Sequence, residues 1–242
     1  MKKLLLLAVL LSATTAFSIE VSTGVAIGVE HVYVPSGFDA NDIKPEIMVS
    51  GWLENSCYKN PTGAVMKKND NSISVSVTAT KYVDSGHVCL QILIPYLITI
   101  PLGTLGEGKY EIVINDGTSS RVNSSISIAT PSSSAVDNYI YARVQNIKYD
   151  KELNIATISG LNPTTCLELE RIKLVYNGEN TYSVLPIMKL VSEECPVEMV
   201  PFEYHFKLPQ PITTNTLLHV RSMDGGALNF LINTNATSIG VY

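Results

Sequence analysis

The chain has 242 residues, with 17 basic and 22 acidic side chains and a formal net charge of −5. Nucleic-acid binding depends on basic side chains that neutralise phosphates, and no basic cluster here is longer than Lys67-Lys68. The charge therefore argues against a nucleic-acid partner, and we expect the acidity to serve solubility. The length allows one large domain or two domains of ordinary size.

The first 18 residues have the order of regions found in a secretory signal peptide. Lys2 and Lys3 precede the apolar run Leu4–Leu11, and cleavage after Ala16 or after Ser18 fits equally well. The run is shorter than the roughly 20 residues of a membrane-spanning helix, no later segment reaches that length, and no cysteine follows that could carry a lipid. We expect a periplasmic or secreted protein without a membrane-spanning segment. Its mature part would have 15 basic and 22 acidic side chains, a net charge of −7.

Alternation of apolar and polar residues predicts strands in the first half of the mature chain. In Ser72–Tyr82, isoleucine, valine and alanine alternate with serine and threonine, which is typical of a strand with one buried and one exposed face. Tyr110–Ile114 predicts a second strand, which turns at Asn115-Asp116-Gly117 and returns as Arg121–Ala129. The Asp-Gly pair supplies the positive φ angles that a hairpin turn requires.

The second half of the chain repeats the first. The stretch TPSSSAVDN (130–138) indicates a linker, because proline and serine separate two patterned segments. Aligning Cys89 with Cys195 brings four features into register: VEHVYV (29–34) with VQNIKY (144–149), VSGWLENSC (49–57) with ISGLNPTTC (158–166), CLQILIPY (89–96) with CPVEMVPF (195–202), and YEIVINDG (110–117) with LHVRSMDG (218–225). We infer a duplicated unit of about 100 residues. Further hairpin turns are predicted at Asn177-Gly178 and Asp224-Gly225-Gly226.

These patterns predict an all-β fold. No window of ten or more residues shows helical periodicity, and we count about seven short strands in each copy, which favours two tandem immunoglobulin-like antiparallel β-sandwich domains. The expected boundaries are a signal peptide at 1–18, a first domain at 19–130, a linker at 131–138 and a second domain at 139–242.

Four cysteines in an exported protein are expected to form disulfides. Of the three possible pairings, only Cys57 with Cys89 and Cys166 with Cys195 preserves two equivalent units. Zinc is the rival hypothesis, but two cysteines per copy without a nearby histidine pair are too few for a structural site. We expect the five residues after each second cysteine to enter the core, the following proline to lie at a bulge or strand edge, and the aromatic residue to cover the sandwich end.

The chain also resembles secreted bacterial β-sandwich modules that carry the patterns G-x-LP-x-x-C, C-x5-PF and L-x-x-G-x-Y-x-V-x-VN. The matching stretches in the first copy are GWLENSC (51–57), CLQILIPY (89–96) and LGEGKYEIVIN (105–115). The second copy reads TTNTLLHVRS (213–222) and lacks the glycine and tyrosine of the last pattern. The resemblance implies export, a β-sandwich and a disulfide, and it carries no known activity.

A second resemblance concerns one loop. Chagasin-like inhibitors of papain-type cysteine proteases are immunoglobulin-like domains with an NPTTG loop, and this chain has NPTTC at Asn162–Cys166 and NPTG at Asn60–Gly63. Asn-Pro and Thr-Thr are also ordinary turn residues. Cys166 replaces the glycine, the other two inhibitory loops have no counterpart, and Trp52 lies elsewhere. Inhibition therefore stands as the alternative function.

No motif predicts a catalytic centre, so we expect a protein that is not an enzyme. The histidines His31, His87, His205 and His219 lie outside nucleophile motifs, and His205 and His219 fall in predicted strands, where a cross-strand or rim position is the simpler interpretation. The four cysteines are assigned to disulfides, which leaves no thiol nucleophile.

The segment FDAND (Phe38–Asp42) gathers oxygen-bearing side chains that could hold calcium, but it lacks the glycine and distal glutamate of a calcium loop. A solvated Asx-turn is the favoured interpretation, and no metal or cofactor is expected. Twelve tyrosines against one tryptophan suit a binding surface, although strands favour tyrosine in any case. The predicted function is a non-catalytic binding or structural protein of the bacterial envelope. Its partner would be another envelope or extracellular protein or a glycan.

Overall fold

The structure is a computed structural model that describes residues 19–42, 44–84, 88–132 and 139–233. The predicted signal peptide and residues 133–138 of the predicted linker lie outside the described residues, as does His87.

The first domain has eight strands, whose bounds are β1 (Ile19–Ala26), β2 (His31–Tyr33), β3 (Glu46–Leu53), β4 (Tyr58–Asn69), β5 (Ser72–Asp84), β6 (Ile94–Pro101), β7 (Gly108–Ile114) and β8 (Val122–Ile128). The second domain also has eight, with bounds β9 (Ile140–Tyr141), β10 (Val144–Asp150), β11 (Ile155–Asn162), β12 (Leu167–Tyr176), β13 (Thr181–Leu190), β14 (Val200–Lys207), β15 (Thr216–Ser222) and β16 (Gly226–Ile232). The only helix among the described residues is the 3₁₀ turn Met223–Gly225, and none is long and apolar enough to cross a membrane.

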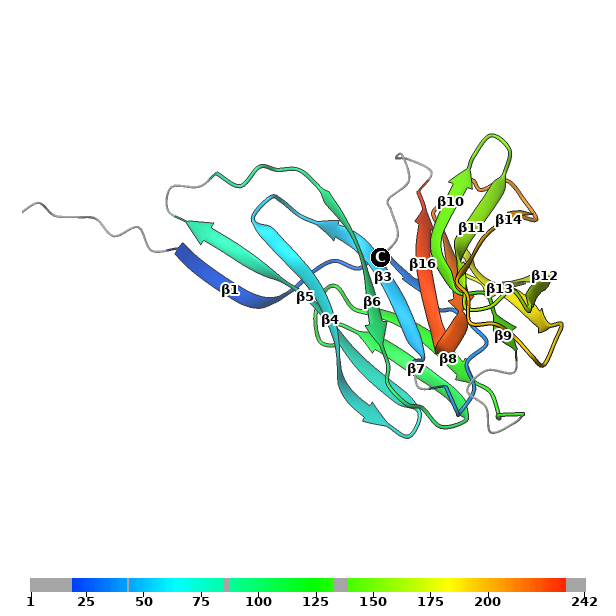
Figure 1. The fold of residues 1–242 in the computed structure, drawn as a ribbon. Helices are drawn as coiled ribbons and strands as arrows, with labels where there is room; N and C mark the ends of the chain where they lie inside the picture. Colours follow the sequence, from blue (N-terminus) through cyan, green and yellow to red (C-terminus); the bar gives the residue numbers. More distant parts are fainter. Residues whose placement is uncertain (1–18, 43, 85–87, 133–138, 234–242) are drawn as a thin grey trace, which may run out of the picture.

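Each domain is a sandwich of a five-stranded and a three-stranded sheet (Figure 1). In the first domain one sheet has the order β1-β5-β7-β8, with β4 also paired to β5, and the other has the order β2-β3-β6. The second domain pairs its strands in the same way, with β9 in the place of β1 and so on through to β16 in the place of β8. All strand pairs are antiparallel except β5 with β7 and β13 with β15. The predicted pair of disulfide-containing β-sandwiches is confirmed, with eight strands per domain where we expected about seven.

The period-two patterns of the sequence place one face of each sheet in a domain core. Ile73, Val75 and Val77 of β5 are buried in the core of the first domain, while the serines between them lie on the opposite face. A separate cluster that includes Leu218, Val220 and Phe230 forms the core of the second domain. Burial of alternate aliphatic side chains therefore drives both halves to the same architecture.

The Ser-Gly pair shared by the two copies has a steric cause. A Cβ atom on Gly51 would lie 2.3 Å from the carbonyl oxygen of Gly28, and one on Gly160 would lie 2.1 Å from that of Arg143. Because neither glycine has a Cβ atom, the chain just before β2 can pass close to β3, and the chain just before β10 can pass close to β11.

Disulfides join Cys57 to Cys89 and Cys166 to Cys195. The surroundings of the two bonds are equivalent, because the Cys57 carbonyl accepts a hydrogen bond from the Tyr82 amide and the Cys166 carbonyl accepts one from the Val191 amide. Each disulfide therefore closes the end of its sandwich next to the long strand β5 or β13.

One expectation about these cysteines is wrong, since the residues that follow the second cysteine do not enter the core. Leu90 and Leu93 are 60% and 66% exposed, and Val197 in the second domain is 96% exposed. These residues precede β6 and β14, and no strand pairs with them. In this part of the chain the first buried residue is Tyr96 of β6, which donates a hydrogen bond to the Gly28 carbonyl.

The prolines of the repeated motif lie where a missing N–H group costs least. Pro95 is in β6 and Pro201 is in β14, and each of these strands is at the edge of its three-stranded sheet. The expected edge position is therefore confirmed.

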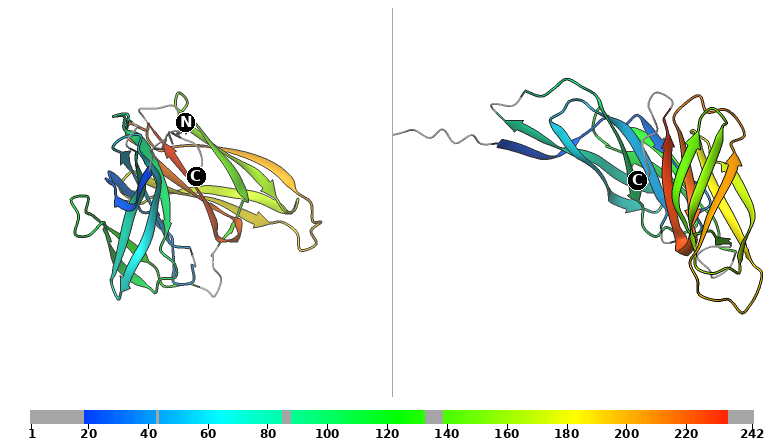
Figure 2. Two further views of the ribbon diagram at one scale, coloured as in Figure 1. Left: turned by 90° about the vertical axis from the view of Figure 1, so that its left-hand side faces the viewer. Right: turned by 45° about the horizontal axis from the view of Figure 1, so that its top comes forward.

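The two domains meet across a third apolar cluster. Tyr33, Met48 and Leu97 project from the three-stranded sheet of the first domain and contact Leu217 and Leu231 of β15 and β16. Figure 2 shows the two sandwiches packed against each other at an angle, with β16 beside the first domain. Part of the outer face of one sheet in each domain is thus buried instead of solvated.

We predict that a protease site inserted after Ser132, which is exposed, can be cut without separating the domains. The buried contacts at the junction hold the two halves together, so they should elute as one species in gel filtration at neutral pH. A matched protein with Leu217→Asp places a charge in the apolar cluster and should release the halves after the same cut. Separation of the halves in the protein with Leu217 intact would contradict the prediction.

Candidate functional site at the domain junction

Strand β15 is buried along its whole length because its two faces lie against different domains. Leu218 and Val220 point into the core of the second domain. The alternate residues Leu217, His219 and Arg221 point toward the first domain, where their contacts lie. The junction therefore contains two charged or titratable side chains that a solvated strand face would have exposed.

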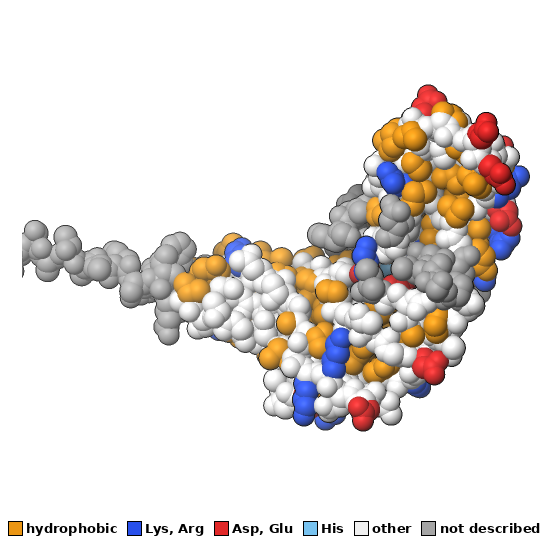
Figure 3. Space-filling view, turned by 60° about the horizontal axis from the view of Figure 1, so that its bottom comes forward, with side chains coloured by type: hydrophobic (Ala, Val, Ile, Leu, Met, Phe, Trp, Pro, Cys, Tyr) orange, Lys and Arg blue, Asp and Glu red, His pale blue; other side chains and the backbone are white. Residues whose placement is uncertain are grey.

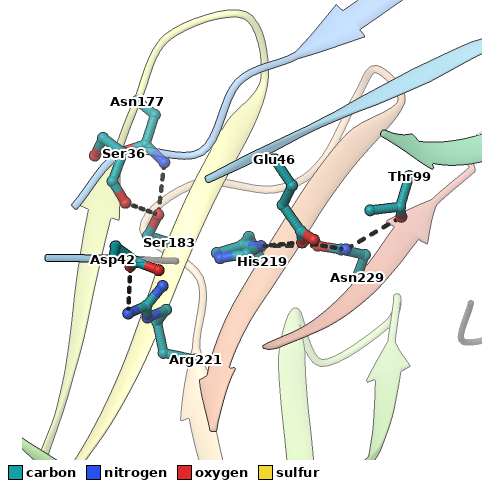
Figure 4. A network of polar contacts seen from close by, with 9 residues as sticks. All are labelled: Ser36, Asp42, Glu46, Thr99, Asn177, Ser183, His219, Arg221 and Asn229. Carbon is teal, nitrogen blue, oxygen red and sulfur yellow. Dashed lines mark hydrogen bonds and ion pairs between the residues drawn. The ribbon is translucent and has the colours of Figure 1, made fainter. Parts of the chain in front are cut away.

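An ion pair between Asp42 and Arg221 is buried in the junction (Figure 4). The Arg221 Nη2 atom donates to Asp42 Oδ2 at 3.0 Å, and the two side chains are 4% and 1% exposed. The guanidinium also lies 5.5 Å from the ring centroid of Phe38 and 6.0 Å from that of Tyr141. Two charges withdrawn from water need this close pairing, because burial of either one alone is very unfavourable.

A second chain of contacts runs through Asn229. His219 Nδ1 lies 2.8 Å from Asn229 Oδ1, and Asn229 Nδ2 donates to Glu46 Oε1 at 2.9 Å. Since the amide nitrogen faces the carboxylate, the amide oxygen must accept from His219, and this places the proton on Nδ1. Thr99 Oγ1 lies 3.4 Å from the same amide nitrogen. The contacts join strands of both domains, as Figure 4 shows.

Burial shifts the pKa values of the two titratable groups in this chain of contacts, His219 and Glu46. Burial, together with the nearby positive charge of Arg221, lowers the pKa of His219 from 6.5 to about 4, although the hydrogen bond to Asn229 acts in the opposite direction. Burial raises the pKa of Glu46, and its hydrogen bond with Asn229 partly offsets that effect. His219 is therefore neutral at physiological pH.

The third set of contacts fixes a turn of the second domain against the first. The side-chain amide of Asn177, in the turn between β12 and β13, bonds to the hydroxyl groups of Ser36 and Ser183. The Ser183 hydroxyl also donates to the Ser36 carbonyl at 3.2 Å. These contacts hold the segment after β2 beside the turn at Gly178.

Next to this turn the surface opens into a groove of about 750 Å³. One wall is the segment Val32–Ser36 of the first domain, the opposite wall is β8, and the turn Asn177–Glu179 of the second domain lies at its end. Serine and asparagine side chains line part of the groove, with valine and proline residues and the charged residues Glu30, Glu179 and Lys109 beside them. Residues of both domains therefore form one polar groove whose position depends on the buried junction.

The three histidines that the structure describes lie in different settings. His31 lies in β2 beside the groove, His219 is buried at the junction, and His205 is an exposed residue of β14. His205 pairs across strands with Thr157, and His219 pairs with Asn229. Both are thus cross-strand residues, as expected. In the part of the chain that the structure describes, no group of three or more His, Cys, Asp and Glu side chains could hold a metal ion.

The segment FDAND forms Asx-turns but is not solvated. Asp39 Oδ1 accepts from the Asn41 amide and Asp42 Oδ1 accepts from the Lys44 amide, as expected for turn residues. Phe38 and Asp42 are buried against the second domain, which contradicts the solvated turn of the sequence interpretation. The Asp42 carboxylate serves the ion pair with Arg221.

The two inhibitor-like stretches lie in different structural settings. Asn162 ends β11, is buried, and its side-chain oxygen accepts a hydrogen bond from the Arg143 amide. Thr164 Oγ1 accepts from the Cys166 amide, next to the disulfide. The stretch Asn60–Gly63 lies within β4. The Asn162 side chain therefore points into its own domain.

Sequence reasoning missed most of the junction residues. Glu46 and Asn229 carried no motif. Arg221 was noticed only within a repeated stretch, Asn177 only as part of a turn and Asp42 only as part of a loop. A signal was present, because Leu217 and Leu231 occupy positions of β15 and β16 that a sandwich with a solvated outer face would fill with polar residues.

Comparisons with known proteins support the class of fold. Residues 47–124, from β3 into β8, match the family model described as the ORF11 beta-sandwich domain. The match covers less than half of the chain and says that the first domain is similar to that β-sandwich module. It does not confirm the cysteine and proline pattern of secreted modules or the likeness to chagasin. The comparison with curated proteins gave no match, and no solved structure matches the chain.

We predict that Asp42→Asn lowers the free energy of unfolding by about 3 to 5 kcal/mol, because it leaves the Arg221 charge buried without its carboxylate. Adding Arg221→Met removes that charge and should recover part of the loss. Urea denaturation of both variants tests this. A loss below about 1 kcal/mol for the single variant would place the pair among solvated surface ion pairs.

We predict that the protein loses stability as the pH falls from 6.5 toward 4. The folded state keeps His219 neutral while the unfolded state takes up a proton below pH 6.5, and the shift to about 4 corresponds to about 3 kcal/mol. Glu46 acts in the opposite direction, because its pKa is raised on folding. The measurement is therefore a comparison of denaturation at pH 7 and pH 5 for the wild type and His219→Asn, in which the asparagine does not titrate. An equal loss in both proteins would contradict the assignment.

Proposed function

We propose that this chain is an exported, non-catalytic protein of the bacterial envelope that binds another protein in the groove at its domain junction. The observation that carries the proposal is that the groove has walls from both domains and that buried contacts fix those walls. Preorganised walls favour binding because little conformational entropy is lost when the partner docks.

Other features support this function. The two disulfides and the secretory order of residues 1–18 fit an oxidising compartment outside the cytoplasm. Figure 3 shows lysine and arginine side chains dispersed over the face drawn there, without the dense basic patch of a nucleic-acid-binding surface. The inhibitor alternative stays a prediction, and the contacts of the Asn162 side chain within its own domain do not favour it.

The groove also suits a protein partner better than a small substrate. Its lining combines serine and asparagine side chains with aliphatic residues such as Val34 and Val122, and it is open to solvent along β8. Enclosed apolar pockets with a few convergent polar groups are the usual sites for small ligands. A long polar groove along a strand is instead typical of sites that bind polypeptide chains.

We predict that immobilised mature protein captures a partner from envelope extract, and that Asn123→Arg in the groove reduces capture at least about tenfold. Asn71→Arg is the matched control, because Asn71 is equally an exposed asparagine but lies outside the groove. Bound protein is quantified by mass spectrometry. Equal capture by the two variants would exclude the groove as the binding site, and turnover of any compound in a hydrolase substrate panel would overturn the non-catalytic assignment.

A further inference from the structure

Strand β8 is an edge strand without the features that normally protect such an edge. It pairs with β7 on one side only. Its seven residues, VNSSISI, include no proline and no charged side chain, and its register with β7 has no bulge. Natural proteins usually protect edge strands with these devices, because unpaired N–H and C=O groups can pair with another chain.

The other edges of the two domains are protected. Strands β4 and β12 contain register shifts and charged side chains, β10 has a register shift, β6 and β14 contain prolines, and β2 has only three residues. Strand β16, the counterpart of β8 in the second domain, lies against β10. In the first domain the corresponding strands β2 and β8 flank the groove.

The backbone groups that face the groove can be identified from one contact. The Ala129 amide donates to the Phe38 carbonyl at 3.0 Å, and the Ala129 carbonyl accepts from the Ala40 amide at 3.1 Å. Because residues of a strand alternate between its two edges, the N–H and C=O groups of Ser127, Ser125 and Asn123 point the same way. No described residue forms a hydrogen bond with these groups.

The side chains of the groove define the segment that would fit. An added strand would place alternate side chains toward Val34 and Val122, which pack against the core, and the others toward solvent. The seven residues of β8 extend over roughly 23 Å at about 3.3 Å per residue. The groove continues to the contact between Ser36 and Asn177, so a bound segment would touch both domains.

We propose that an extended segment of a partner polypeptide, with alternating aliphatic and polar residues, binds in the groove by adding as a strand to the outer edge of β8. This inference rests on the proposed function and names the chemistry of the partner. The hydrogen bonds come from the backbone of Asn123, Ser125 and Ser127, and the aliphatic side chains give the register.

The probe is a phage-displayed library of decapeptides in which Val, Ile or Leu alternates with Ser, Thr or Lys, selected on the mature protein with its disulfides intact. The best synthetic peptide is then measured against Ser125→Pro and Ser125→Thr. Proline removes an N–H group that faces the groove and leaves the pairing with β7 in place, so binding should weaken at least about tenfold. Threonine keeps the N–H group, and binding should stay within about twofold of the wild type.

Amide hydrogen exchange gives a readout that does not depend on a variant folding. Peptide binding should slow exchange at Asn123, Ser125 and Ser127, whereas Ser124 and Ile126, whose amides face β7, should change little. Equal peptide affinity for Ser125→Pro and wild type, uniform protection along β8, or failure of the library to yield a binder would each overturn strand addition. Self-association of the protein that Ser125→Pro abolishes would make a second copy the occupant and overturn the partner segment.

These experiments distinguish failure of strand addition from failure of the proposed function. Capture of an envelope protein that depends on Asn123 but is unchanged by Ser125→Pro would leave the proposed function intact and remove strand addition. Peptide binding with the alternating protection pattern, but no envelope protein captured, would support strand addition and count against the proposed function.

Discussion

The buried ion pair between Asp42 and Arg221 is the constraint on which the arrangement of this protein depends. It joins the segment after β2 to β15 of the other domain, with both side chains almost fully removed from water. An ion pair in this setting tolerates little displacement, because separation leaves two desolvated charges. The neighbouring apolar cluster supplies the favourable burial, and the ion pair restricts it to one relative position of the domains. The groove beside Ser36 and Asn177 keeps its shape for the same reason.

The two domains share one fold but differ on their faces and edges. Their strand pairing is identical, and the paired glycines, prolines and disulfides serve the same steric purposes in both. Their edges differ, since β16 lies against β10 while β8 borders an open groove. The outer faces differ too, because the junction buries β15 and β16 of one copy against β2, β3 and β6 of the other. The two domains thus share one strand pairing and differ in which faces and edges are covered.

The sequence predicted the fold far better than the site. Period-two alternation, Asp-Gly turns and matched cysteines are local features, so strands such as β5 and β7 could be recognised without knowing the tertiary structure. His219 was interpreted as a cross-strand or rim residue and no role was predicted for Arg221, because a local pattern does not reveal that another domain covers their strand face. The prediction for the loop from Val88 to Leu93 was wrong in the opposite sense, because this loop is exposed. Its apolar composition suggested burial, but the loop lies outside both sheets and its apolar side chains are exposed.

The unprotected edge of β8 carries a risk of aggregation. A flat strand of uncharged residues with free backbone groups can template aggregation, and the other exposed edges of this protein carry a bulge, charges or prolines or are very short. The neutral serine and asparagine side chains on β8 provide solubility without blocking approach of another backbone. Domain 2 also limits access, because its turn at Gly178 closes one end of the groove. The junction therefore leaves the edge of β8 open while the second domain bounds the groove at one end.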